Sequence, residues 1–134
     1  MSAKDPKIVI SIYLRGNQLE PDYISNILGI QPSESQKKGE LRPCSKQVIA
    51  KIGVWSLVAQ TDSRAIHDHI DELLGVIGTV QARLNQIDGV EDAYLDIFIA
   101  LDDEGTRTAE CRLSEKHLEE LSRLGLCVHF TVMS

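Results

Sequence analysis

Hydrophobic and polar residues alternate along two stretches of the chain, and this period of two is typical of strands that bury one face. The first stretch runs from Lys7 to Arg15, and its aliphatic face is formed by Ile8, Ile10, Ile12 and Leu14. The second runs from Ala93 to Leu101, and its aliphatic face is formed by Leu95, Ile97, Ile99 and Leu101. We predict a strand in each stretch, with the aliphatic face turned toward the core.

The same alternation predicts two more strands. Gly53 to Gln60 contains the only tryptophan of the chain, Trp55. A tryptophan side chain can bury roughly 150–250 Å², so we expect Trp55 to lie between the sheet and a helix, and its strand to be central. The last strand is predicted from Leu126 to Met133, with an inner face formed by Leu126, Val128, Phe130 and Val132.

Apolar residues recur at helical spacing in the segment 64–86, which predicts the longest helix, and Ser63 is placed to cap its N-terminus. Gly75 and Gly78 lie inside this segment. Each glycine costs about 1 kcal/mol relative to alanine within a helix, so we expect close packing against a neighbour at both positions.

Two shorter helices have clear signals at both ends. The first begins at Pro21, whose missing N–H would be unpaired at that position anyway, and ends at Gly29, which suits a left-handed C-terminal residue. The second covers Glu115 to Leu124, with Ser114 as its N-cap and Gly125 as its C-terminal stop.

The segment 108–113 can return beside the preceding strand as a hairpin partner. With that strand included, the order favours an α+β fold: a mostly antiparallel sheet with helices packed on one face, ferredoxin-like in part. The length of 134 residues predicts a single α+β domain over residues 1–134.

The net charge of −6 argues against a nucleic-acid partner, because such proteins need basic residues to replace phosphate counterions. No apolar run is long enough to span a bilayer, so we expect no membrane association. The three cysteines are odd in number and far apart, which favours a reducing compartment and a cytoplasmic location.

No residue pattern indicates catalysis or metal binding. His67 and His69 lie two residues apart, and on a helix such side chains diverge by about 200°, so we interpret them as surface residues. His117 and His129 receive the same interpretation as solvated side chains. We predict a protein that is not an enzyme and that holds neither a metal nor a cofactor.

Two charged regions are candidate binding surfaces. Acidic residues exceed basic ones late in the chain, and the candidate partner-binding residues are those beside predicted strands and turns: Glu91, Asp92, Asp102, Asp103 and Glu104. The segment 31–47 is predicted to be a loop that concentrates positive charge. Lys37, Lys38 and Arg42 in this loop form an alternative anion-binding site, although a solvated charged loop is the simpler interpretation because the P-loop pattern is absent.

Several motifs spread over nearly the whole chain belong together. They are the opening strand, the helix exit Leu28-Gly29-Ile30 with Pro32, the loop Lys37-Lys38-Gly39, the strand Trp55-Ser56-Leu57 and the closing Leu124-Gly125-Leu126. In these features the chain resembles the bacterial domain-of-unknown-function family 4279. The resemblance implies an α+β fold and no established activity, and some members look like immunity proteins of bacterial toxin systems.

From the acidic region and this resemblance we predict a non-enzymatic protein-binding module. Its most concrete form is an immunity-type inhibitor that covers a basic protein, such as a toxin domain, with an acidic surface. The sequence also leaves a homo-oligomer open. The alternative is a small-molecule-binding regulatory domain, because Gly16-Asn17, Leu19 and Pro21 resemble the strand-to-helix turn of ACT domains. A concave pocket at that turn would favour the alternative.

Overall fold

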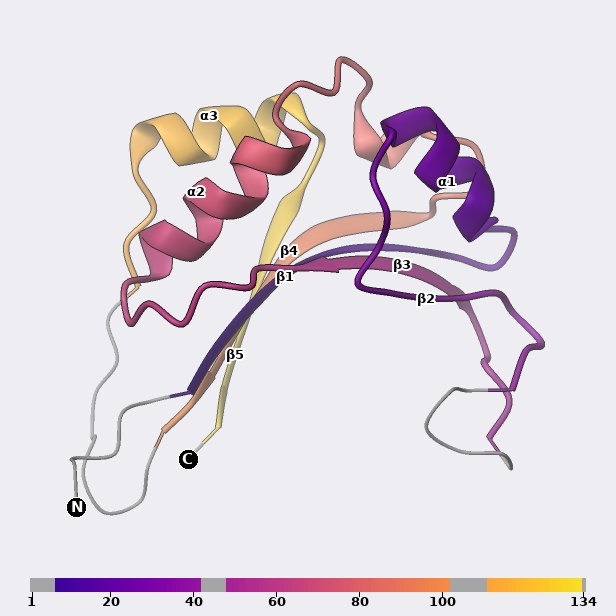
Figure 1. Cartoon of the computed structure of the whole chain (residues 1–134), viewed down its shortest axis with the longest axis horizontal. Helices are drawn as coiled ribbons and strands as arrows, with labels where there is room; N and C mark the ends of the chain where they lie inside the picture. The colour runs from indigo at the N-terminus through magenta and orange to yellow at the C-terminus, as the bar shows by residue number, and fades with distance from the viewer. Residues whose placement is uncertain (1–6, 42–47, 102–110, 134) are drawn as a thin grey trace.

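The computed structural model describes residues 7–41, 48–101 and 111–133, and these residues form a five-stranded sheet with three α-helices on one of its faces (Figure 1). The strands are β1 (Lys7–Gly16), β2 (Glu34–Gln36), β3 (Gly53–Val58), β4 (Asp92–Ala100) and β5 (Cys127–Met133). The helices are α1 (Pro21–Leu28), α2 (Ile66–Ile77) and α3 (Glu115–Arg123), and a short 3-10 helix covers Leu84–Gln86. The predicted α+β class is therefore confirmed.

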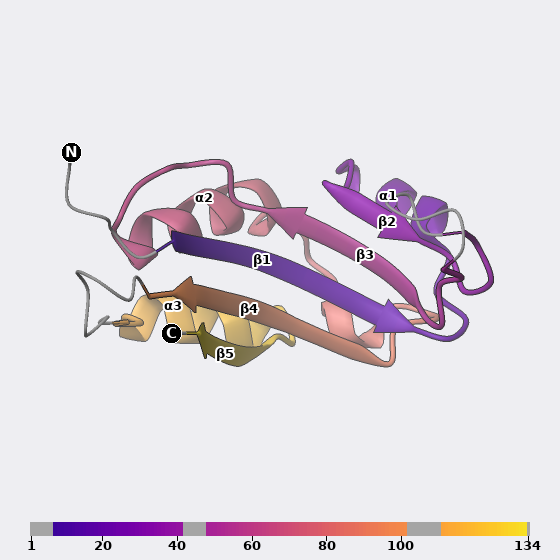
Figure 2. The same ribbon diagram turned by 90° about the horizontal axis from the view of Figure 1, so that it is seen from below.

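The strand order across the sheet is β2-β3-β1-β4-β5, as the view from below makes clear (Figure 2). Neighbouring strands are antiparallel except for β4 and β5, which run parallel. The central strand is β1, whose Leu14 lies opposite Trp55 on one side and Ala93 on the other. The Trp55 strand, β3, lies inside the sheet between β2 and β1, as predicted for a central strand, and β1 occupies the middle position.

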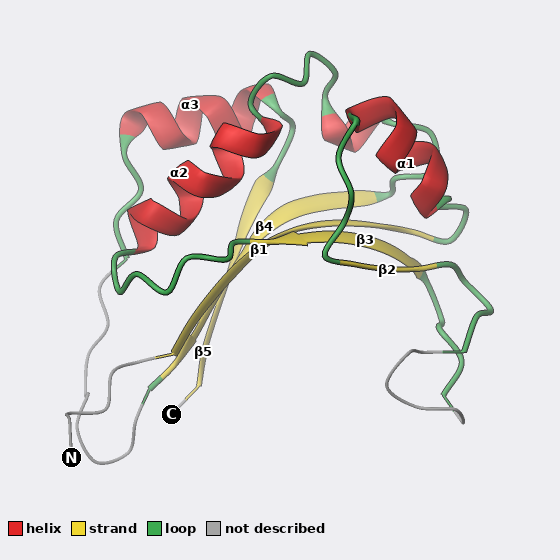
Figure 3. Ribbon diagram, in the orientation of Figure 1, coloured by secondary structure: helices red, strands yellow, loops and turns green. Residues whose placement is uncertain are grey.

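The hydrophobic core fills the space between the three helices and the aliphatic face of the sheet (Figure 3). Ile10, Ile12 and Leu14 of β1 are fully buried there. Trp55 is also fully buried, and its indole N–H donates to the Ser25 hydroxyl of α1 over 3.0 Å. The prediction that Trp55 lies between sheet and helix is confirmed, and α1 is the helix that covers it.

The two short helices end as their sequences predict. Gly29 and Gly125 both adopt left-handed backbone angles, with φ of 68° and 74°. The Ser114 hydroxyl accepts the backbone N–H of His117 over 3.1 Å, so it is the N-cap of α3. These local signals work because a cap satisfies backbone groups that the helix itself leaves unpaired.

The long helix is shorter than predicted. It ends at Ile77 with Gly78 as its C-cap, and its N-cap is Ala65 rather than Ser63, whose hydroxyl accepts the Ala65 backbone N–H. A Cβ added at Gly75 would meet no described atom within 4 Å, so the close packing expected there is absent. The sequence predicted a longer helix because Leu84 continues the helical spacing of apolar residues. Leu84 is buried in the core, but it belongs to the separate 3-10 helix.

The predicted hairpin over residues 108–113 was also wrong. β4 pairs with β1 along one edge and with β5 along the other, so neither edge is left for a returning strand. Residues 108–110 lie outside the described part of the chain, and residues 111–113 are not in a strand. Conversely, Glu34–Gln36 forms the edge strand β2 within a segment that the sequence predicts to be a loop.

The last strand has a less buried inner face than predicted. Phe130 and Val132 are 54% and 57% exposed. Val128 and Leu126, at the start of the strand beneath the helix layer, do contact the core. The end of β5 extends past α2 and α3 in Figure 1, in agreement with the exposure of Phe130 and Val132.

Candidate functional site

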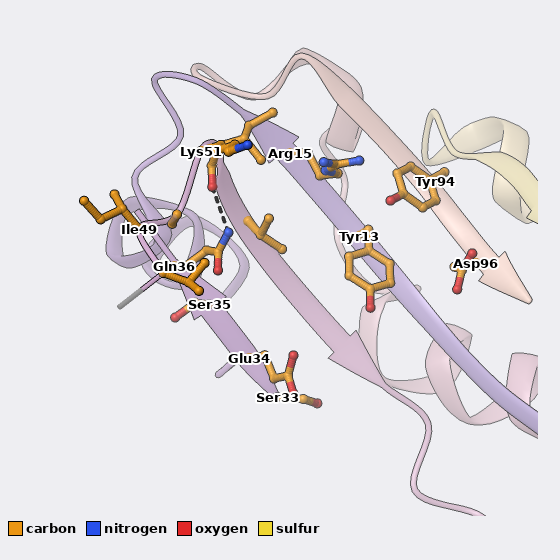
Figure 4. Close-up of a pocket in the computed structure, with 14 residues that line it drawn as sticks. Tyr13, Arg15, Ser33, Glu34, Ser35, Gln36, Ile49, Lys51, Tyr94 and Asp96 are labelled. Atoms are coloured by element: carbon orange, nitrogen blue, oxygen red, sulfur yellow. Dashed lines mark hydrogen bonds between the residues drawn. The ribbon is translucent and has the colours of Figure 1, made fainter. Parts of the chain in front are cut away.

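The face of the sheet opposite the helices carries a pocket with a volume of about 1030 Å³ (Figure 4). Its floor is formed by β1, β3 and β4, and its outer wall is formed by β2 and the segment 48–52. Side chains on a strand alternate between the two faces, so every second residue of the core strands points to this side. These residues are polar or aromatic where their neighbours are aliphatic, which makes this open face the candidate site.

Three aromatic rings form a row across the open face. Tyr13 and Tyr94 lie opposite each other in the β1–β4 register, and their ring centroids are 5.4 Å apart. The His129 ring stacks on the other side of Tyr94 at 4.1 Å. Burial raises the pKa of the Tyr94 hydroxyl, and the neighbouring Arg15 guanidinium opposes that rise. The row is therefore held by stacking from three strands, and its pocket end is the half-buried Tyr13.

Four charged side chains line the pocket, and their signs are separated (Figure 4). Arg15 and Lys51 lie at one end, and Asp96 lies at the other. Glu34 lies on the outer strand β2, level with Tyr13 in the strand register. Among the residues that the structure describes, Glu34, Lys51 and Asp96 form no ion pair. Burial raises the pKa of Asp96, with the nearby His129 acting in the opposite direction. Asp96 is thus a partly desolvated carboxyl group that lies opposite His129 of the neighbouring strand β5.

A buried hydroxyl group lies on the same face of β3. Ser56 pairs with Tyr13 on β1 and with Glu34 on β2, so its side chain shares their face. The residue is fully buried, and its Oγ has no hydrogen-bond partner in the described parts of the chain. A buried polar atom without a partner costs about 1–3 kcal/mol, so it is more typical of a binding face than of a core chosen for stability.

The five acidic candidates do not gather into one described patch. The Glu91 carboxylate accepts the backbone N–H of Asn17 and so holds the turn after β1. Asp92 is exposed at the first position of β4. Asp102, Asp103 and Glu104 lie outside the described residues; the last one before them, Leu101, follows the far end of β4. The rest of β4, residues 93–100, therefore separates Asp92 from Leu101.

The basic loop is partly engaged within the chain. The Lys37 Nζ lies 3.0 Å from the Glu20 carboxylate, and this hydrogen bond raises the pKa of Lys37. The Lys37 backbone N–H also donates to the Glu40 carboxylate over 2.8 Å. Lys38 is exposed, and Arg42 lies outside the described residues. The structure therefore places a carboxylate where the alternative site would hold an external anion.

Two of the histidines interpreted as solvated are buried. The His69 Nε2 lies 2.7 Å from the Ser63 carbonyl oxygen, and the His117 Nε2 lies 2.7 Å from the Asp71 carboxylate. Both rings lie on inward faces of their helices with an acceptor in reach, a placement that spacing alone does not reveal. His67 and His129 are exposed as predicted. Within the described residues, no group of three or more His, Cys, Asp or Glu side chains could hold a metal ion.

The turn that resembles ACT domains is closely packed. A Cβ on Gly16 would lie 1.9 Å from the Gly89 carbonyl oxygen, and Gly89 itself lies against Gln18 and Leu19. The chain thus fills the space at this turn, whereas the pocket described above lies on the open face and reaches the turn only through Arg15.

Four residues of the open face were not predicted from the sequence to be binding residues: Tyr13, Ser56, Tyr94 and Asp96. A signal for them was present, because they occupy the polar face of predicted strands. What the alternation could not supply was the strand order that brings β1, β3 and β4 together.

A family model described as "Domain of unknown function (DUF4279)" matches residues 6–134. No curated protein and no solved structure matches the chain. None of the helices in the described segments has the length and apolar character needed to cross a membrane.

Proposed function

The chain belongs to the DUF4279 family, and we propose that it is a non-enzymatic module that binds another protein through the open face of its sheet. One observation carries this proposal. The helices cover one face of the sheet, and the other face combines stacked aromatic rings with charged side chains, of which Glu34, Lys51 and Asp96 form no ion pair with a described residue. Tyrosine and arginine are enriched at the centres of protein interfaces, so this composition suits a partner better than bulk solvent.

The size and shape of the pocket favour a segment of a protein over a small molecule. Small-molecule pockets enclose roughly 300–1,000 Å³ and bury most of their ligand, and this pocket of about 1030 Å³ lies at the top of that range. It also runs along β1 and β3 instead of closing into a cavity (Figure 4). An extended segment would lie along the strands and contact Tyr13 near its middle.

The concrete form that we propose is an immunity-type inhibitor of a basic toxin domain. The net charge of −6 supports a basic partner, because opposite charges accelerate association and suppress wrong partners. In this proposal Glu91, Asp92, Asp102, Asp103 and Glu104 steer the partner toward the molecule, and the open face makes the contact. A cytoplasmic location fits the free thiols of Cys111 and Cys127.

A small-molecule regulatory domain is the second candidate, and the charged side chains that line the pocket favour it. Arg15 and the partly desolvated Asp96 carboxyl group are polar groups of the kind that orient small ligands. Thermal shifts with a metabolite panel would distinguish the candidates, because only this one expects stabilisation by a small molecule alone.

Coexpression with the product of a neighbouring toxin gene tests the proposed function. Wild-type protein should protect the cells and co-purify with the toxin. Tyr13→Ala should weaken the complex at least about tenfold, as hot-spot truncations do. Val76→Ala, on the exposed side of α2, is the matched control and should bind normally. A wild-type protein that neither protects cells nor retains any basic protein would contradict the proposal.

A further inference from the structure

We infer that the pocket on the open face binds an extended peptide segment with opposite charges at its two ends. The anionic group of the segment lies at the end formed by Arg15 and Lys51, and its cationic group lies beside Asp96. This inference rests on the proposed function, since the segment belongs to the partner protein.

The strand register sets the length of the ligand. Asp96 lies opposite Ser11, and Arg15 follows Ser11 by four residues on the same face of β1. Four strand steps of about 3.3 Å separate these levels by roughly 13 Å along the sheet. A single amino acid carries its ammonium and carboxylate on one carbon and cannot reach both ends. An extended segment of about four to five residues can, since each residue spans at most about 3.3–3.6 Å.

The charges at the two ends are available to a ligand. Glu34, Lys51 and Asp96 form no ion pair with any described residue, and four residues along β1 separate the level of Asp96 from that of Arg15. Asp96 has also lost part of its hydration, as the raised pKa of its carboxyl group indicates. A cationic side chain placed beside Asp96 would replace that lost hydration with a charged contact.

The middle of the pocket floor is an aromatic ring held in place. Tyr13 lies between the levels of Asp96 and Arg15, with Val54 beside Arg15, and stacking on Tyr94 fixes the Tyr13 ring. A fixed aromatic ring supplies contact area at a low cost in conformational entropy, so this part suits small or apolar residues.

Charge separation also excludes uniformly charged segments. A basic segment would place a cation beside Arg15 and Lys51, and an acidic segment would place a carboxylate beside Asp96. Specificity for a dipolar segment therefore comes from repulsion at one end as much as from attraction at the other.

Nuclear magnetic resonance titrations of the isotope-labelled full chain with three kinds of blocked pentapeptide test this inference. The dipolar kind is Arg-Ala-Ala-Ala-Glu, which is used in both sequence directions. The other two kinds are singly charged, because Gln replaces either Arg or Glu. We expect chemical-shift changes around Tyr13 and Tyr94. The dipolar peptide in its preferred direction should bind about threefold to fivefold more tightly than either singly charged peptide, as partly exposed ion pairs allow.

Two variants assign the ends. Asp96→Asn should remove the advantage given by Arg, and Arg15→Gln should remove the advantage given by Glu. Glu119→Gln, on the exposed side of α3, is the control and should preserve both advantages. The dispersion of the amide spectrum verifies that each variant is folded.

The inference is overturned if the three peptides bind equally or not at all, or if Asp96→Asn behaves like Glu119→Gln. Should this happen while Tyr13→Ala still weakens the partner complex, the inference fails and the proposed function stands. Should Tyr13→Ala leave the partner complex intact, the proposed function itself fails.

Discussion

The two faces of the sheet are built from the same strands but serve different purposes. On β1, the residues Ile10, Ile12 and Leu14 point to the helices and are fully buried. Tyr13 and Arg15, which alternate with them along the strand, point to the pocket. The covered face has the regular packing of a core chosen for stability. Within the described residues, the open face retains charged side chains that form no ion pair and a buried hydroxyl group without a hydrogen-bond partner, which a core would exclude.

This difference shows where stability and binding are located. Burial of aliphatic area stabilises the fold at about 25 cal/mol per Å², and the covered face supplies most of that burial. Groups that weaken the fold without visible compensation cluster at functional sites, because function and not stability selects them. Substitutions on the two faces should therefore separate loss of folding from loss of binding.

The largest expected effect is on the covered face. Trp55→Ala should lower the free energy of unfolding by about 3–5 kcal/mol, because it removes a fully buried ring and the hydrogen bond to Ser25. Val54→Ala, one residue away on the open face, should cost less than about 1 kcal/mol. Urea denaturation measures both variants, and an unchanged midpoint for Trp55→Ala would show that the covered face does not carry the stability.

A smaller effect is expected at the turn where the sheet ends. Gly89→Ala should cost about 1–3 kcal/mol, because Gly89 has a φ of 91° and a Cβ there would lie 2.9 Å from the Gln18 carbonyl oxygen. Gly75→Ala is the matched control. It lies in α2 with open space around it and should stabilise the protein by about 0.4–1 kcal/mol. Equal melting temperatures for the two variants would contradict this prediction.

Tyr13→Ala should separate the two faces most directly. The ring is half-buried on the open face, so we expect its loss to cost about 1 kcal/mol or less of stability. Binding of the partner should nevertheless fall at least about tenfold. Calorimetric titration and denaturation of the same preparation measure both quantities. A stability loss as large as that of Trp55→Ala would mean that the open face also belongs to the core.

The smallest expected effect depends on pH. The raised pKa of Asp96 means that the folded state binds its proton more tightly than the unfolded state does, so the ionised carboxylate lowers stability at neutral pH. Asp96→Asn should therefore be slightly more stable than wild type at pH 7. The gain should shrink as the pH falls through the raised pKa toward about 3.9, the ordinary value for aspartate.

Urea midpoints at several pH values measure this difference between Asp96→Asn and wild type. Asp88→Asn, an exposed residue before β4, controls for the substitution of a surface carboxylate. A gain for Asp96→Asn that grows as the pH falls would reverse the sign and show that Asp96 stabilises the fold.

The sequence by itself determined the local features of this protein. Alternation with period two located β1, β4 and the aliphatic residues that become buried, because a strand presents every second side chain to the same face. Gly29, Ser114 and Gly125 marked helix ends, since capping depends on residues close together in the chain. The burial of Trp55 followed from its size.

The tertiary structure decided which strands are neighbours, and with that it decided the candidate site. Alternation reports which face a side chain occupies but not which strand lies beside it, so the central position of β1 and the parallel pairing of β5 with β4 were not predictable from local pattern. Tyr13, Ser56 and Tyr94 come from three strands far apart in the chain. They form one surface only because pairing between distant segments places β1 between β3 and β4.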